Sequence, residues 1–121
     1  MLKPTQIGRA AEFLVCYTLQ VNGIECYHVN STTDIIATIP SGRLIRLEVK
    51  GATSIQARQK SYRFLASKTD NSDWYAFVAL DLCLVIFMRK SQIKTQTVTI
   101  QKSEFTSEHQ AETLQQLGAE T

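Results

Sequence analysis

The segment TTDIIATIPSGRLIRLEVKGA, residues 32–52, predicts a β-hairpin with a defined register. Pro40 suits the first position of the turn, and Gly42 suits the left-handed position that ends a three-residue loop. Such a loop sets Ile39 opposite Arg43. The same register gathers the apolar residues of both arms on one face, whereas a shift by one residue would turn one arm over. These residues are Ile35, Ala37, Ile39, Ile45, Leu47 and Val49.

The other face of this hairpin carries the charges. Asp34 lies opposite Glu48 in this register, and Lys50 follows on the same face. Like charges opposite each other destabilise a strand pair, and opposed Cβ atoms are ~4.5–5.5 Å apart, so one cation between the carboxylates would compensate both. Mg²⁺ is typically held by one or two carboxylates together with water and substrate phosphates. The pair therefore predicts a Mg²⁺ site, with Lys50 as a positive point charge beside it.

The remaining sequence predicts a helix, several strands and a second helix. Helical spacing begins at Pro4 and ends before Asn22-Gly23, with Ile7, Ala11, Leu14, Thr18 and Val21 on its apolar face. Strands are expected at 24–29, 62–67, 74–80, 83–88 and 95–100, and a helix at 103–118 with Phe105, Ala111, Leu114 and Leu117 on its apolar face. Continuous apolar runs within 74–88 are typical of strands covered on both faces, so Trp74, Tyr75 and Phe77 are expected in the core. This order predicts an α/β (α+β) fold with a central mixed β-sheet flanked by helices.

Composition places the chain among ordinary globular proteins. Its 121 residues, 44% hydrophobic and 20% charged, suit a single domain over residues 1–121. The net charge of +2 means that affinity for a polyanion must come from local clusters of charge. The three cysteines lack the spacing of a disulfide framework or zinc site, and neither a signal peptide nor a membrane helix is indicated. We expect a cytoplasmic protein without a membrane partner.

The charged residues of the hairpin follow a known pattern. Asp34, thirteen further residues and then Glu48-Val49-Lys50, after a helix that carries Gly8-Arg-Ala-Ala-Glu12, resemble the PD-(D/E)XK nuclease superfamily. The resemblance covers residues 7–90, and the later strands are similar to those of small homing and Holliday-junction-resolving nucleases. Thr33 stands where the family's motif has a proline.

The resemblance implies a restriction-endonuclease-like core and a Mg²⁺-dependent DNA endonuclease, with Mn²⁺ able to substitute. Asp34, Glu48 and the backbone carbonyl of Val49 would bind the metal. Lys50 would orient or activate the attacking water, and Glu12 would support the site from the first helix. Because one site cuts one strand, cleavage of both strands of DNA implies a homodimer or higher homo-oligomer. The apolar hairpin 74–88 and the C-terminal helix are the expected contact surfaces.

Other interpretations stay open at this point. A Glu-x-Lys pattern often arises by chance. On a solvated hairpin it would form a surface ion pair that adds little to the free energy of unfolding. A non-catalytic nucleic-acid-binding or regulatory protein on the same fold is the second hypothesis, and a structural interaction module is the third. Four basic residues after the motif either follow DNA phosphates or belong to a solvated loop; they are Arg58, Lys60, Arg63 and Lys68.

Overall fold

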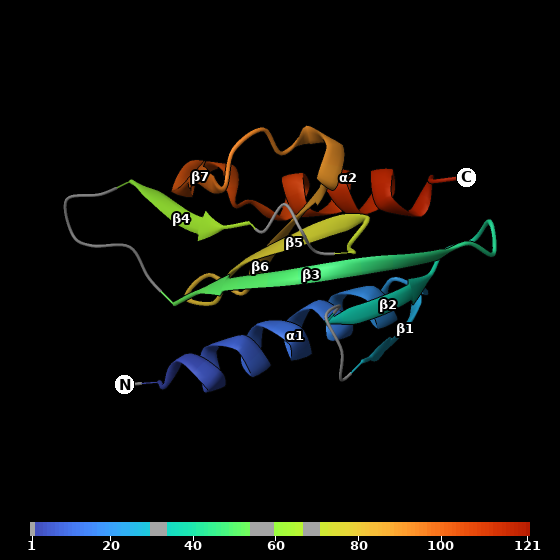
Figure 1. The fold of residues 1–121 in the computed structure, drawn as a ribbon, viewed down its shortest axis with the longest axis horizontal. Coiled ribbons are helices and arrows are strands. Elements are labelled where there is room, and N and C mark those ends of the chain that lie inside the picture. Colours follow the sequence, from blue (N-terminus) through green and yellow to red (C-terminus); the bar gives the residue numbers. More distant parts are fainter. Residues whose placement is uncertain (1, 30–33, 54–59, 67–70) are drawn as a thin grey trace.

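The computed structural model describes residues 2–29, 34–53, 60–66 and 71–121. Two helices and seven strands form within these ranges (Figure 1). In chain order they are α1 (Pro4–Val21), β1 (Glu25–His28), β2 (Ile35–Thr38), β3 (Leu44–Ala52), β4 (Ser61–Leu65), β5 (Trp74–Ala79), β6 (Leu84–Arg89), β7 (Thr97–Gln101) and α2 (Ser107–Gly118), with short 3₁₀ turns at Lys90–Gln92 and Lys102–Glu104. No helix in the described part of the chain combines the length and the apolar character that a bilayer-spanning helix needs.

The main sheet has five strands in the order β1-β2-β3-β5-β6. Neighbouring strands in this sheet are antiparallel except for β3 and β5, which run parallel. The prediction of a mixed sheet flanked by helices is therefore confirmed. Parallel neighbours need a crossover connection, which is usually helical. Here the crossover contains β4, which pairs with β7 in a separate two-stranded sheet.

The register predicted for the hairpin is confirmed. Ile35 pairs with Leu47, and the N–H of Ile39 donates to the carbonyl of Arg43 at 3.1 Å. Gly42 closes the turn at a φ of 90°, in the left-handed region that favours glycine. All six apolar residues predicted for the inner face are buried. The turn and the apolar face therefore specify the same pairing.

The two faces of the main sheet are covered by different elements. Helix α1 packs on one face, where Ala11, Val15 and Leu19 join the buried residues of β1, β2 and β3. Strands β4 and β7 cover the opposite face at β5 and β6, where Tyr62 and Phe64 pack with the aromatic residues of β5. Figure 1 shows α1 and β4 on opposite sides of β3. Strand β5 lies between these layers, and all six of its side chains are buried.

Helix α2 covers an edge of the sheet. Strand β6 is the last strand on its side, so the backbone N–H groups along its outer edge need acceptors. Gln110 accepts from the N–H of Val85 at 2.8 Å, and Thr113 accepts from the N–H of Phe87 at 3.1 Å. Side chains of α2 therefore occupy hydrogen-bonding positions that a further strand would otherwise take.

The apolar faces of the helices differ from their predicted positions. In α1 the buried residues are Ala11, Val15, Thr18 and Leu19, whereas Val21 is 62% exposed because it lies on the outer face of the helix, four residues after the exposed Tyr17. Helix α2 begins at Ser107 rather than at 103, since the side chain of Thr106 caps it by accepting the N–H of His109. In this helix Ala111 is exposed and Thr113 is buried, because Thr113 faces the edge of β6.

The expected use of the hairpin 74–88 as a contact surface is wrong. Trp74, Tyr75 and Phe77 are 2%, 0% and 0% exposed, which confirms that they belong to the core. Strand β5 is flanked by β3 and β6, and β6 is covered by α2. The apolar character of this hairpin is therefore satisfied within the chain.

Gly51 marks a close approach between β3 and α1, and it supplies the first testable prediction. A Cβ at Gly51 would lie 2.8 Å from the Cβ of Ala11, which is closer than carbon atoms pack. We expect Gly51→Ala to lower the free energy of unfolding by about 1–3 kcal/mol, the usual cost of overpacking. Urea denaturation measures this change.

The matched control is Gly8→Ala. A Cβ at Gly8, which lies within α1, meets no atom within 4 Å. This change should raise the free energy of unfolding by about 1 kcal/mol, because alanine favours the helix over glycine. Equal effects of the two substitutions would contradict the close contact between α1 and β3.

Candidate active site

Asp34 lies where the two arms of the hairpin separate. It directly precedes β2, and its Oδ2 accepts a 2.9 Å hydrogen bond from the backbone N–H of Val49 on β3. The register of β2 and β3, continued by one residue beyond Ile35, brings Asp34 level with Glu48. Just beyond the last β2–β3 pair, the Asp34 carboxylate thus accepts the backbone hydrogen bond of β3 that another strand residue would otherwise accept. The bond holds Asp34 against the Glu48-Val49-Lys50 segment.

Glu48 and Lys50 lie on the sheet face opposite α1, beside the aromatic residues of β5. Their register partners in the parallel pair are Tyr75 and Phe77. The Glu48 side chain is 15% exposed and its Oε2 is buried, whereas the Lys50 side chain is 31% exposed. The Nζ of Lys50 lies 3.6 Å from Oε1 of Glu48. Lys50 therefore compensates part of the carboxylate charge that the opposed pair brings together.

The backbone of Val49 also faces this opening. The N–H and C=O groups of one strand residue point to the same side of the strand. On β3 the backbone groups of the even-numbered residues point toward β5. For example, the backbone carbonyl of Arg46 accepts from the N–H of Asp73 at 2.8 Å. Val49 directs its N–H to Asp34 on the other side, so its carbonyl faces that side too. Asp34 and the N–H and carbonyl groups of Val49 thus lie together just beyond the last β2–β3 pair, with Glu48 and Lys50 on either side of Val49 along β3.

Glu12 approaches the same region from α1. Its Oε1 lies 3.2 Å from Nδ1 of His28 at the end of β1. Burial raises the pKa of Glu12, and the negative charge of Asp34 raises this pKa further, while His28 and Arg9 lower it. The influence of Asp34 places the two carboxylates within electrostatic reach of each other. The direct side-chain partner of Glu12 in the described part of the structure is His28, and a role for Glu12 beside the hairpin carboxylates stays a prediction.

Sequence reasoning missed the role of His28. Besides its contact with Glu12, its Nε2 lies 3.5 Å from Sγ of Cys16, and its ring packs edge-on against Phe13 with centroids 5.4 Å apart. Burial raises the pKa of the Cys16 thiol to about 12, and Cys26 adds to this rise, so the thiol stays protonated at neutral pH. The spacing of Glu12 and Cys16, four residues apart on one helix, is the sequence signal that could have indicated a shared partner.

The donor groups at the opening suit Mg²⁺ in kind and number. Among the residues that the structure describes, no three His, Cys, Asp or Glu side chains gather as a metal-binding group. Asp34, Glu48 and the Val49 carbonyl offer hard oxygen donors, and Mg²⁺ commonly takes only one or two carboxylates and completes its shell with water and phosphate. The buried Oε2 of Glu48 lies in the part of the site where water is partly excluded.

The basic residues expected to contact DNA are only partly described. Lys60 and Arg63 are exposed, Lys60 just before β4 and Arg63 within it. Arg58 and Lys68 lie outside the described residues. The structure therefore supports an accessible position for two of the four.

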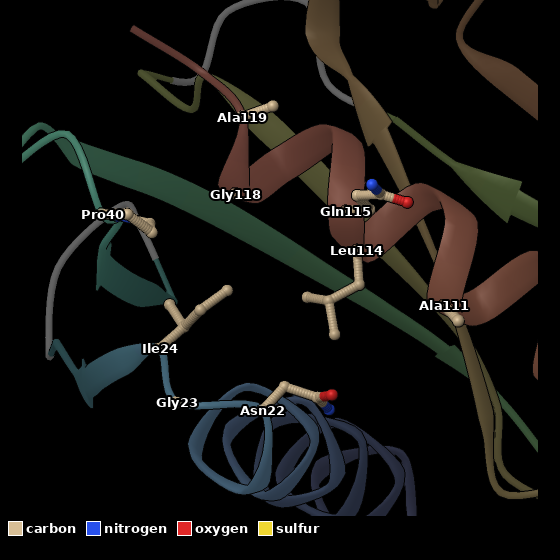
Figure 2. A pocket seen from close by; sticks show the side chains of 9 residues that line it. All are labelled: Asn22, Gly23, Ile24, Pro40, Ala111, Leu114, Gln115, Gly118 and Ala119. Carbon is tan, nitrogen blue, oxygen red and sulfur yellow. The ribbon is translucent and has the colours of Figure 1, made fainter.

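An apolar pocket lies away from these groups. It has a volume of about 450 Å³ and is formed by the end of α1, the hairpin turn and α2. Figure 2 shows Ile24 and Leu114 extending toward its interior, with the amides of Asn22 and Gln115 at its sides. None of the predicted site residues lines this pocket.

Comparison with known proteins shows similarity at the level of the fold. No family model matches the chain, and no curated protein matches its sequence. A solved structure of a bacterial homing endonuclease, I-Ssp6803I, superimposes with a TM-score of 0.70 over 83% of this chain and 76% of that chain, at 13% sequence identity. The chain therefore has a mixed α+β fold similar to that of a bacterial homing endonuclease.

Proposed function

We propose that this chain is a metal-dependent DNA endonuclease that hydrolyses phosphodiester bonds. The observation that carries the proposal is the arrangement just beyond the last β2–β3 pair, where Asp34 accepts from the Val49 N–H and Glu48 lies beside Lys50. The similarity of the fold to a homing endonuclease supports it. A non-catalytic nucleic-acid-binding or regulatory protein on the same fold is the alternative, and the cleavage assays below separate the two functions.

The chain's own residues divide the work as follows. Asp34, Glu48 and the Val49 carbonyl would hold Mg²⁺, with Mn²⁺ as a substitute. The ion, when bound, polarises the phosphoryl group and lowers the pKa of water. Lys50 brings a positive charge to the phosphate oxygens and orients the attacking water, since negative charge must be stabilised there in the transition state. Glu12, which is held by His28, would support the site from α1.

We predict that Asp34→Asn and Glu48→Gln each lower cleavage of plasmid DNA at least about 1000-fold, because several kcal/mol of metal-derived stabilisation are lost. In Asp34→Asn the new amide still offers an oxygen to the Val49 N–H, so folding is retained, whereas Asp34→Ala would lose that hydrogen bond. The alanine variant should therefore lose about 1 kcal/mol of stability. Gel assays with Mg²⁺ or EDTA and thermal melting measure both effects.

The matched control is Asp81→Asn. Asp81 is an exposed carboxylate that accepts hydrogen bonds from the hydroxyl of Tyr62, away from the opening. Its substitution should leave the rate of cleavage unchanged. Cleavage that continues in EDTA, or that survives Glu48→Gln, would contradict the proposed function.

We predict that Lys50→Ala lowers turnover by about 100-fold or more while the affinity for Mn²⁺ stays the same or increases. The reason is that Lys50 is a competing cation 3.6 Å from Glu48 in the metal-free protein, rather than a ligand. Calorimetric titration with Mn²⁺ and single-turnover cleavage separate the two quantities, and Lys94→Ala, which removes an exposed lysine, is the control. Loss of Mn²⁺ binding in Lys50→Ala would show that Lys50 organises the carboxylates instead.

We also propose that the chain acts as a homodimer or higher homo-oligomer, because cleavage of both strands needs two sites. Since the hairpin 74–88 is buried, an exposed face of α1 is our candidate for the contact. Phe13, Tyr17 and Val21 follow one another at helical spacing on α1 and are 63%, 65% and 62% exposed. This apolar stripe is self-complementary when two copies of α1 pack antiparallel.

Tyr17→Glu tests the stripe, because it places a charge in the middle of the proposed contact. We expect wild-type protein to sediment with a mass of at least two chains and the variant with the mass of one, 13.6 kDa. The variant should nick one strand but no longer cut both. Thr5→Glu, also at an exposed position of α1, adds the same charge as a control. A wild-type protein that sediments as a monomer would contradict the assembly.

A further inference from the structure

Strands β4 and β7 form a two-stranded antiparallel ribbon with a buried face and an exposed face. Backbone hydrogen bonds of 2.7 Å from Ala66 to Gln96 and from Lys102 to Lys60 extend the pairing by one residue at each end. We call residues 60–66 and 96–102 the β4–β7 ribbon. Its inner face packs on the main sheet through buried side chains, which include Tyr62, Phe64 and Ile100.

The outer face of the β4–β7 ribbon is exposed and consists mainly of polar side chains that are able to donate or accept hydrogen bonds. Arg63 lies opposite Thr99, and Ser61 lies opposite Gln101, because the register pairs them. Both strands alternate between buried and exposed positions, as a ribbon with one free face requires. The exposed residues are Arg63, Leu65, Thr97, Thr99 and Gln101, with Ser61 half-exposed.

Positive charge outweighs negative charge on this ribbon, although the Glu104 carboxylate accepts from the N–H of Gln101 at 2.9 Å at one end. It contains Lys60, Arg63 and Lys102 and has no Asp or Glu in either strand. These three charges exceed the net charge of +2 of the whole chain, so the rest of the molecule is slightly acidic. A surface of this kind attracts a polyanion although the overall field is weak.

We infer that the β4–β7 ribbon reads base edges in the major groove of duplex DNA, an inference that rests on the proposed function. The major groove of B-form DNA admits a two-stranded β-ribbon, and seven extended residues span roughly 20 Å, more than half a helical turn. Arg63 and Thr99, at the centre of the ribbon, contact base edges. Lys60 and Lys102, at its end, contact phosphates and fix its position.

The ribbon and the candidate active site lie on the same side of the main sheet. Glu48 and Lys50 pair in register with Tyr75 and Phe77 of β5, which belong to the cluster that the ribbon covers. Figure 1 shows β4 on the side of β3 that lies away from α1. We therefore infer that one DNA duplex contacts the β4–β7 ribbon and the candidate active site together. The proposal commits to DNA, because the major groove of duplex RNA is too narrow for side chains to read.

The first experiment tests the groove with Glu48→Gln, which binds DNA without cutting it. The probes are two duplexes of one sequence, one of which carries 5-glucosyloxymethyl groups on its cytosines so that sugars fill the major groove. We expect the modified duplex to bind at least tenfold more weakly and a minor-groove-binding drug to have no effect. Equal affinity for both duplexes, or tighter binding of duplex RNA, would overturn the inference.

The second experiment tests whether Arg63 and Thr99 contact bases. The protein selects its preferred sequences from a pool of random DNA duplexes, and the selected sequences are compared between variants. Arg63→Lys keeps the charge but loses the planar fork that recognises guanine, so discrimination at one position should fall about tenfold or more while the salt dependence of binding is unchanged. Thr99→Val keeps the strand and removes one hydroxyl, which should relax a neighbouring position. Arg9→Lys, at an exposed position on α1, should change nothing.

The outcomes separate this inference from the proposed function. Selected sequences that stay the same in both ribbon variants, or a wild-type protein without any sequence preference, would overturn the role of the β4–β7 ribbon. Metal-dependent cleavage of plasmid by wild-type protein would still uphold the nuclease in that case. Absence of both cleavage and DNA binding would overturn the two together.

Discussion

The register of the β2–β3 hairpin is the constraint on which the rest of the molecule depends. Because side chains alternate strictly along a strand, this one pairing decides that six apolar residues face α1 and that the carboxylates face away from it. The hydrogen bond from Val49 to Asp34 then ends the pairing in a defined way. Gly51, two residues further, allows α1 to approach this part of β3 closely. Packing, site geometry and helix position all follow from the same strand.

The charged residues of the opening are stabilised by different means. Asp34 is held by a backbone donor and Glu48 by a lysine, whereas Glu12 is held by an imidazole and has a pKa raised by burial and by Asp34. A bound cation would relieve the repulsion that remains between these carboxylates. The fold thus fixes these side chains through contacts made within the chain, and the binding of a divalent ion beside them stays part of the proposed function.

Much of the fold could be predicted because its signals are local. The turn Pro40-Ser41-Gly42 and the apolar alternation specified the hairpin, and the apolar run of β5 indicated a strand covered on both faces. Contacts between distant segments could not be predicted. The pairing of β4 with β7, the approach of His28 to Glu12 and the side chains of α2 on the edge of β6 all join residues whose local patterns carry no information about each other. The rotation of α1 depended on tertiary contacts as well, whereas the start of α2 is set by a local signal, the Thr106 cap, that the helix prediction did not use.

The place of β4 in the crossover has a consequence for the order of folding. A helix in that position would form from its own residues, but β4 has its hydrogen-bonding partner in β7, more than thirty residues later in the chain. Closing that separation costs entropy before the pairing rewards it. We therefore expect the layer over β5 and β6 to be completed only when residues 97–101 are available, because β7 supplies one of its two strands. A chain that ended before β7 would expose part of this aromatic face, which would favour aggregation, although the β2–β3 hairpin with Asp34 and Glu48 is present in such a chain.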